Sequence, residues 1–133
     1  MSHAYDHAVS SAKIHGGVPD DYLKIHLWFD EMKSAHCDFR SRILRHHAEG
    51  IRECTNVFGV TIKNSEGNEI PVSILGEQHV REDCGWIPSF THWAEHLQKQ
   101  PWMDNPTVFR RKSYRITDHA VEQHQQKETN SNG

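Results

Sequence analysis

The sequence predicts an α+β protein that is mainly helical, with about five helices, one β-hairpin and a polar C-terminal tail. Apolar residues recur at helical spacing over most of the chain before residue 103. The spacing changes to strict alternation at about residues 58–75. Residues 104–133 are polar and follow neither period. We therefore expect one domain over residues 1–103 and a partly disordered extension over residues 104–133.

Three helices are predicted before the alternating region. Pro19 is placed to begin the second, because proline is favoured at the first helical position. Asp38 is placed to cap the third. Gly50 lies inside this third helix, where glycine costs about 1 kcal/mol relative to alanine, so we expect another backbone or a ligand to come close to it. The expected bounds are residues 2–14, 19–34 and 38–55.

A β-hairpin is predicted at about residues 58–75. Apolar and polar residues alternate at 60–63 and 70–74, and Gly67 between them suits a turn with positive φ. Pro71 cannot donate a ladder hydrogen bond, so the second strand is expected to have a free edge on which a homodimer could form. Two more helices are predicted, one at residues 77–84 and one that is capped by Ser89 and bears Phe90, Trp93 and Leu97.

Composition and charge disfavour several classes of protein. The 15 basic and 18 acidic residues give a net charge of −3, whereas general nucleic-acid binders are usually basic. No apolar run approaches the roughly 20 residues of a membrane span. The N-terminal residues lack a signal-peptide pattern, so the protein is expected to stay in the compartment where it is made. The 3 cysteines form no C-x-x-C motif, which favours reduced thiols over a disulfide framework or a thiolate zinc site.

Histidine is the residue type that is most over-represented, at 12 of 133 residues, and it is the commonest metal ligand in proteins. Several histidines have a second ligand type four residues later. Such a pair projects from one face of a helix, about one turn apart, so both side chains can meet one metal ion. The pairs are His3 with His7, His26 with Asp30, and His79 with Asp83.

Any single pair at this spacing is more often explained by surface or core hydrogen bonding. However, His26 and His47 both lie on apolar faces of predicted helices, and a buried imidazole must satisfy two ring nitrogens. Histidines that converge from different helices beside an aspartate are better explained by a metal ion. We predict a divalent metal, zinc first and manganese, iron or nickel as alternatives. The predicted ligands are His26, Asp30, His47 and His79, with His46 as an orienting neighbour.

The same residues predict a possible metal-dependent hydrolase that acts on a phosphoester. Glu77 or Asp83 would accept a proton from metal-bound water, and Arg40 or Arg45 would bind a small anionic substrate. Glu77 could equally be a first-turn carboxylate favoured by the helix dipole, and the arginines a solvated helix face. The alternative is a non-catalytic protein whose surface binds a protein partner.

Five segments resemble a family of small uncharacterised bacterial and phage proteins, grouped as a domain of unknown function. They are DYLKIHLWFDEMK (21–33), ILRHHAEGI (43–51), FG (58–59), GEQHVREDCGWIP (76–88) and PWM (101–103). The resemblance spans residues 3–103 and brings no established activity. It implies that a shared pattern includes His26, Asp30, His46, His47, Glu77, His79 and Asp83. It also implies a cytoplasmic location in a bacterial host cell and, for the alternative function, a phage inhibitor of an anti-CRISPR-like kind that binds a host-defence complex.

Overall fold

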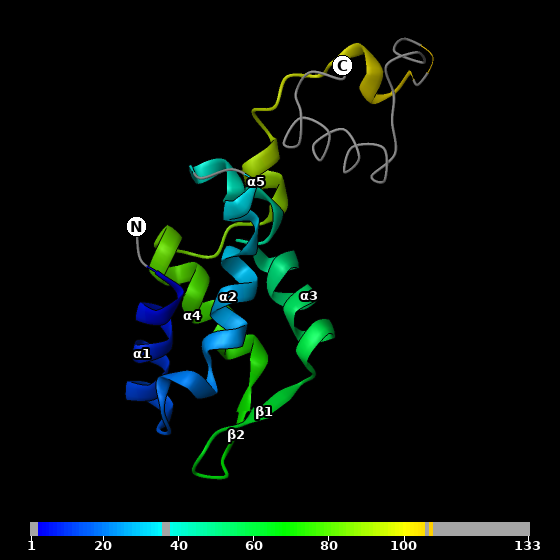
Figure 1. The fold of residues 1–133 in the computed structure, drawn as a ribbon. Helices are drawn as coiled ribbons and strands as arrows, with labels where there is room; N and C mark the ends of the chain where they lie inside the picture. The colour runs from blue at the N-terminus through cyan, green and yellow to red at the C-terminus, as the bar shows by residue number, and fades with distance from the viewer. Residues whose placement is uncertain (1–2, 36–37, 106, 108–133) are drawn as a thin grey trace, which may run out of the picture. The chain divides into compact units, whose positions relative to one another are not determined.

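The computed structural model describes residues 3–35, 38–105 and 107. It divides the chain into two compact units, residues 1–96 and 97–133. In the described part of the first unit, several helices pack together and one short hairpin lies at one end of them (Figure 1), and the predicted mainly helical α+β fold is confirmed. The elements are α1 (Ala4–His15), η1 (Pro19–Asp21), α2 (Leu23–Asp30), η2 (Glu31–Ser34), η3 (Phe39–Leu44), α3 (Ala48–Phe58), β1 (Thr61–Lys63), β2 (Glu69–Pro71), α4 (Val72–Cys84) and α5 (Phe90–Ala94).

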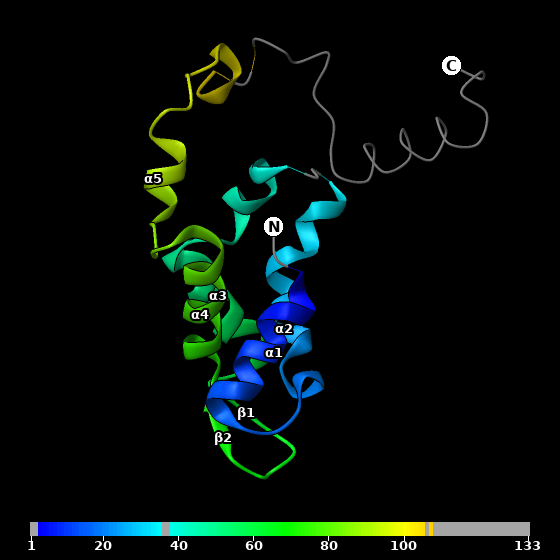
Figure 2. The ribbon, with the colours of Figure 1, turned by 90° about the vertical axis from the view of Figure 1, so that its left-hand side faces the viewer.

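Helix α4 is the central element of the first unit, because it packs against α1, α2 and α3. Figures 1 and 2 place the hairpin at one end of these four helices. Apolar side chains from all of them are removed from water, which is the main driving force for folding. The buried apolar core is Ala8, Tyr22, Ile25, Phe29, Ile51, Cys54, Ile62, Ile70, Val72, Leu75 and Val80.

The predicted third helix, residues 38–55, is wrong in its middle. The chain forms η3, then leaves the helical conformation, and α3 begins only at Ala48. His47 has extended backbone angles (φ −161°, ψ 173°), and its Nδ1 accepts a hydrogen bond from the Gly50 amide at 3.0 Å. A Cβ on Gly50 would collide with the carbonyl oxygen of Arg45. The expectation that another backbone approaches this glycine is therefore confirmed, and its cause is the break that precedes α3.

The predicted second strand is too long. The strands pair Thr61 with Pro71 and Lys63 with Glu69, and α4 begins at Val72 rather than at residue 77. Pro71 lacks an N–H group and has φ −61°, so it suits the residue before a helix better than the middle of a strand. The earlier start makes α4 a 13-residue helix that reaches from the hairpin to the far end of the core.

Two other predicted helices are also altered. Residues 19–34 form η1, α2 and η2 in succession, and Tyr22, at the first junction, is completely buried. Helix α5 ends at Ala94, earlier than expected. The second unit contains η4 (Pro101–Met103). The predicted disorder of the tail concerns residues that lie almost entirely outside the described ranges.

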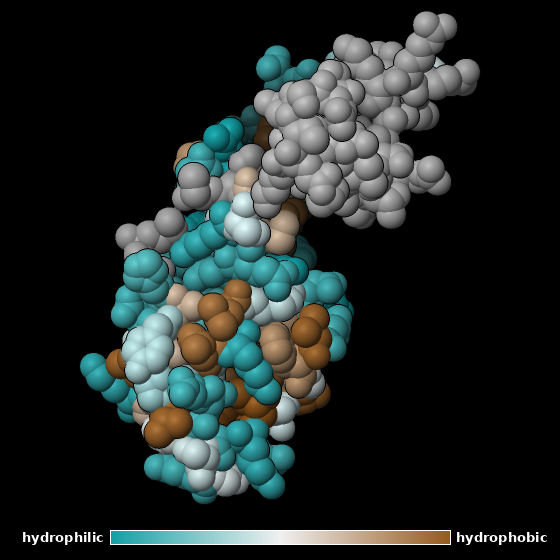
Figure 3. All heavy atoms as spheres, viewed as in Figure 1, coloured by the Kyte–Doolittle hydropathy of each residue, from teal (hydrophilic) through white to brown (hydrophobic). Residues whose placement is uncertain are grey.

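Across the described residues, none of the helices combines the length and apolar character that a membrane span requires. The face of the first unit seen in Figure 3 interleaves polar and apolar side chains rather than presenting one continuous apolar surface.

Candidate metal centre

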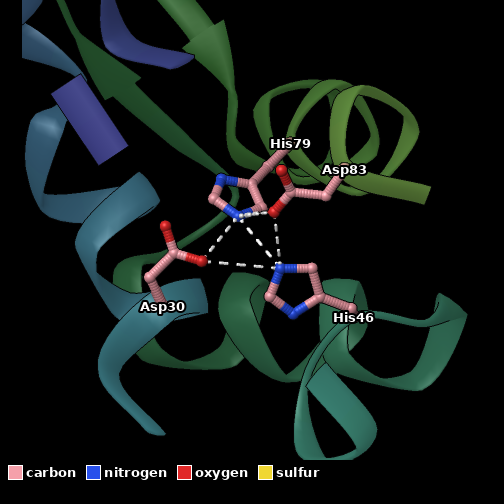
Figure 4. A group of neighbouring side chains, drawn as sticks. All are labelled: Asp30, His46, His79 and Asp83. Atoms are coloured by element: carbon pink, nitrogen blue, oxygen red, sulfur yellow. Dashed lines mark hydrogen bonds and ion pairs between the residues drawn. The ribbon is translucent and has the colours of Figure 1, made fainter. Parts of the chain in front are cut away.

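Two histidines and two aspartates meet where the ends of α2 and α4 approach the segment before α3 (Figure 4). Asp30 is the last residue of α2. His79 and Asp83 lie one turn apart on α4, and His46 comes from the break between η3 and α3. These side chains are nearly inaccessible to water: Asp30 is 7% exposed and the other three at most 2%. We call these four residues the His–Asp cluster.

One atom of each residue points to a common centre. His46 Nε2 lies 3.2 Å from His79 Nε2 and 2.9 Å from Asp83 Oδ2. Asp83 Oδ2 is 3.2 Å from His79 Nε2. Asp30 Oδ1 completes the group, at 3.3 Å from His79 Nε2 and 3.6 Å from His46 Nε2. All four atoms lie within 4.8 Å of one another.

These spacings fit the size of a metal site. Zinc–nitrogen and zinc–oxygen bonds of about 2.0–2.1 Å around a tetrahedral ion place neighbouring ligand atoms about 3.3–3.4 Å apart. The five distances above range from 2.9 to 3.6 Å and bracket that value. Imidazole and carboxylate donors without thiolate suit zinc, manganese, iron and nickel. The cluster could therefore hold a divalent cation with small movements of its side chains.

Both carboxylates of the cluster stay ionised. Burial raises the pKa of Asp30, but hydrogen bonds from His46 and His79 outweigh burial and hold that pKa below its usual value. Burial likewise opposes ionisation of Asp83, whose pKa is nevertheless lowered by hydrogen bonds with His46, His7 and His79. Buried anions require compensating positive charge. A divalent cation at the centre would supply it.

His7 of α1 fixes the second oxygen of Asp83. Its Nε2 lies 3.1 Å from Asp83 Oδ1 and its Nδ1 2.6 Å from Glu82 Oε1. Burial lowers the pKa of His7, but the hydrogen bonds with these two carboxylates outweigh it and the pKa is raised. As an imidazolium, His7 donates to both carboxylates. Asp83 is thereby oriented so that Oδ2 faces the cluster.

A chain of hydrogen bonds leads from α1 to His79. Gln78 Nε2 lies 3.0 Å from the His7 carbonyl and 3.3 Å from the Glu82 carboxylate, and both of these groups only accept. Gln78 Oε1 is therefore the acceptor for the Ser11 hydroxyl at 2.8 Å. Ser11 Oγ also lies 3.1 Å from the His7 carbonyl, another acceptor. The single hydroxyl hydrogen must thus point to one of these acceptors.

This chain places a hydrogen on Nδ1 of His79. His26 Nε2 lies 2.8 Å from Ser11 Oγ and must donate, because the hydroxyl hydrogen is already used. Burial, with a smaller contribution from neighbouring His79, lowers the pKa of His26 to about 3, so its ring is neutral and its Nδ1 is an acceptor. That atom is 2.9 Å from His79 Nδ1, which must carry the hydrogen. His79 Nδ1–H is thereby directed at His26, and His79 Nε2 faces the cluster, the orientation that a metal ligand needs.

His46 is held differently. The indole Nε1 of Trp93 in α5 donates to the His46 backbone carbonyl at 2.8 Å. The ring packs edge-on against Phe29, with centroids 5.9 Å apart. Its Nδ1 is buried and has no hydrogen-bond partner, so backbone placement and apolar packing orient this ring.

The structure separates several predicted site residues from the cluster. His47, predicted as a ligand, has both ring nitrogens engaged with the backbone: Nε2 donates to the Ile43 carbonyl at 2.8 Å and Nδ1 accepts from Gly50. His26, another predicted ligand, contacts His79 through Nδ1 at 2.9 Å, on the side of that ring opposite the cluster atom Nε2. Glu77 pairs with Arg81 at 3.4 Å, on the side of α4 turned about 200° from His79.

The predicted anion-binding arginines lie elsewhere too. Arg40 pairs with Asp38 at 2.8 Å. The Arg45 guanidinium stacks over the Trp28 ring at 4.1 Å. Arg42 reaches the site instead: its Nη1 donates to the Asp83 carbonyl at 3.3 Å, and its Nη2 lies 3.9 Å from Asp83 Oδ1. Spacing in the sequence could not distinguish these arginines, because Arg40 and Arg42 lie in the 3-10 helix η3 rather than in the predicted α-helix.

The chain is thus a small helical protein with a buried His–Asp cluster that could bind a metal ion. It belongs to the family described as Domain of unknown function (DUF6915), whose model matches residues 2–103. This match confirms the resemblance to a domain of unknown function. Searches of the curated proteins and of the solved structures found no match.

Proposed function

We propose that this protein binds one divalent metal ion through Asp30 Oδ1, His46 Nε2, His79 Nε2 and Asp83 Oδ2. The observation that carries the proposal is the convergence of four buried donor atoms from three separate segments, all within 4.8 Å of one another and five pairs of them 2.9–3.6 Å apart. The orientation of His79 Nε2 toward the other three atoms, held by the hydrogen bond between His79 Nδ1 and His26 Nδ1, supports it independently. Relative to the sequence prediction, His46 and Asp83 take the places of His26 and His47 as ligands. Zinc remains the first choice and manganese, iron and nickel the alternatives.

Elemental analysis of the purified full chain tests this proposal. We expect about one metal ion per chain in the wild type and near-complete loss in His79→Gln and His46→Gln. The matched control is His96→Gln, because the His96 side chain is 90% exposed. Folded protein without any metal, or equal metal content in all four proteins, would refute the assignment.

We further propose that the bound metal serves hydrolysis of a phosphoester. Asp83 lines a cavity of about 370 Å³ together with Arg42, within the size range of small-molecule sites. A metal ion at the cluster would lower the pKa of a coordinated water towards neutrality. Arg42 would contact the substrate anion in place of Arg40 and Arg45. Asp83 is a ligand in this proposal, and Glu77 has no part in it.

A second candidate function is supported by the burial of the cluster. Four donor side chains that are at most 7% exposed would occupy all four coordination positions of a tetrahedral ion and leave none for water, as in structural sites. The protein would then be a non-catalytic module that acts by binding a partner, and the host-defence inhibitor suggested by the resemblance is one such role.

Cobalt substitution separates the two functions. A hydrolytic site requires a coordination position that exchanges with solvent, so added azide should change the visible spectrum of the Co²⁺ protein. A closed structural site would give an intense four-coordinate spectrum that does not respond to azide. The latter result would reject hydrolysis and retain metal binding.

A further inference from the structure

A cavity of about 370 Å³ lies beside the His–Asp cluster, where the C-terminal end of α4 meets α5. Its wall shares Asp83 with the cluster. The wall also contains Trp93, whose indole donates a hydrogen bond to the His46 carbonyl. The cavity is therefore next to two of the four proposed ligands. The lining residues are Arg42, Asp83, Cys84, Trp86, Pro88, His92 and Trp93.

The polar end of this cavity is built around a guanidinium group. The Arg42 side chain is 17% exposed, and its Nη1 is held by the Asp83 carbonyl. A guanidinium carries five N–H donors. This bond and the ion pair of Nη2 with Asp83 Oδ1 at 3.9 Å do not use all of them, so N–H groups remain for a ligand. Arginine presents such donors in a planar fork that matches phosphate and carboxylate oxygens.

The other walls are aromatic. Trp86 is 52% exposed, and its ring meets the edge of His92 with centroids 4.8 Å apart. Trp93 is fixed by its hydrogen bond to His46, and Pro88 is anchored because its carbonyl accepts from the Ala48 amide at 2.8 Å. A half-exposed tryptophan adds little to the core. Beside a second indole, it offers a flat apolar surface on which planar rings stack.

We infer that this cavity binds a small molecule in which a planar aromatic ring carries a phosphate, with the phosphate at Arg42 and the ring against Trp86 and Trp93. The inference rests on the proposed hydrolase function and names its substrate class. Both aryl phosphates and nucleoside monophosphates have this chemistry. A metal ion at the cluster would add attraction for the phosphate, because it offsets the negative charge of Asp83.

Isothermal titration calorimetry on the full chain, with zinc bound and after chelation, tests the inference. The probes are phenyl phosphate, adenosine monophosphate, inorganic phosphate and phenol. We expect saturable binding of at least one of the first two, about ten-fold or more tighter than inorganic phosphate or phenol. Tighter binding of phenyl phosphate would identify the ligand as an aryl phosphate, and tighter binding of adenosine monophosphate would identify it as a nucleotide.

Two variants locate the binding, and a third is their control. Arg42→Gln removes the charge, and Trp86→Ala removes an exposed wall that the fold does not need. Each should weaken binding about ten-fold or more, as expected for loss of a charge-assisted hydrogen bond or of one stacked ring. Arg81→Gln on the exposed face of α4 should bind like the wild type. If Arg42→Gln fails to fold, Trp86→Ala alone decides.

The outcomes distinguish this inference from the metal proposal. A protein that holds one metal ion but binds neither ring-bearing phosphate overturns the inference and leaves the metal proposal intact. Equal binding of phosphate and phenyl phosphate, or undiminished binding by Trp86→Ala, also overturns it. Tight, Trp86-dependent binding by a protein that holds no metal supports the cavity assignment and rejects the hydrolase.

Discussion

The Ser11 hydroxyl determines which ring nitrogen of His26 carries a hydrogen. Because His26 bonds to His79, the hydroxyl also determines that a hydrogen lies on His79 Nδ1. Loss of the hydroxyl leaves the His26 Nε2–H group without its acceptor, so the hydrogen bond between His26 Nδ1 and His79 Nδ1 no longer has a fixed direction. Outer partners of metal-binding histidines typically change metal affinity about 10- to 100-fold. We therefore expect Ser11→Ala to bind metal more weakly by this factor, without loss of stoichiometry.

A competition assay with a coloured chelator measures this change. The matched control is Ser10→Ala, on the same helix but only half-buried. Equal affinities for Ser11→Ala and wild type would show that the hydrogen-bond chain does not orient His79.

His26 also makes the stability of the metal-free protein depend on pH. Its pKa falls from 6.5 in the unfolded chain to about 3 in the fold, so between these values the unfolded state binds more protons. The contribution of His26 to stability is therefore fully present above pH 6.5 and is lost as the pH falls from there towards 3. His7 acts in the opposite sense, because its pKa is raised, but the shift of His26 is the larger one.

We expect the metal-free protein to lose about 1–2 kcal/mol between pH 7.5 and pH 5, as measured by urea unfolding. His26→Asn removes the titrating ring, so its stability should vary less over this interval. A wild-type protein that becomes more stable at pH 5 would contradict the neutral state assigned to His26.

At the scale of the elements, the break between η3 and α3 is the feature that creates the cluster, because it sets His46 apart from His47. Gly50 makes the break possible. An added Cβ would collide with the Arg45 carbonyl. To relieve the collision the backbone would have to move, which costs more free energy than a side-chain rotation. We expect Gly50→Ala to lower the free energy of unfolding by more than about 2 kcal/mol and to reduce metal binding.

Gly67 provides the comparison. It has φ +84° in the hairpin turn, but a Cβ there meets nothing within 4 Å, so Gly67→Ala should cost only about 1–2 kcal/mol and leave metal binding unchanged. Urea unfolding of both variants tests this contrast. Similar destabilisation with similar metal content would mean that the break tolerates a side chain.

The elements also show what a single sequence can and cannot predict. Local stop signals indicated the ends of two helices: Gly16 and Gly17 follow α1, and Gly85 follows α4. Helical spacing was the signal for the predicted third helix. The same spacing continued through Ile43, His47 and Ile51, so it gave no sign of the break. That break depends on tertiary contacts, such as the bond between the Ala48 amide and the Pro88 carbonyl. Similarly, Val72 fits both a strand and a helix, and only the pairing of the strands decides between them.

The candidate site was therefore predictable in part. Asp30 and His79, expected as ligands from their spacing, lie in the cluster. Asp83 was expected nearby as a proton acceptor, and His46 as an orienting neighbour. His7 belonged to a noted pair, but its contact with Asp83 joins residues that are 76 positions apart. Contacts over such separations leave no local signal in one sequence.

For the whole molecule, the proposed metal would join segments that are distant in the chain. Ligands on α2, α4 and the loop before α3 come together only in the folded protein, so the metal binds the folded state in preference to the unfolded one. Free metal at about 100 times its Kd adds about 2.7 kcal/mol of stability. We expect the melting temperature to rise by several degrees with zinc and to fall after chelation.

Differential scanning calorimetry measures this shift, with magnesium as a control ion that imidazole ligands do not favour. His79→Gln should show no response to zinc. A zinc-loaded wild type that melts at the same temperature as the chelated protein would place the metal outside the folded core.

The hydrogen bond from Trp93 to the His46 carbonyl has one more consequence. The Trp93 indole forms part of the cavity wall and also restrains His46, a proposed metal ligand. A movement of the His46 backbone therefore changes both the metal site and the cavity wall. Occupancy of the two places is then thermodynamically linked, and linkage is reciprocal. If the bound cation raises the affinity for the aromatic phosphate by some factor, the bound phosphate must raise the affinity for the cation by the same factor.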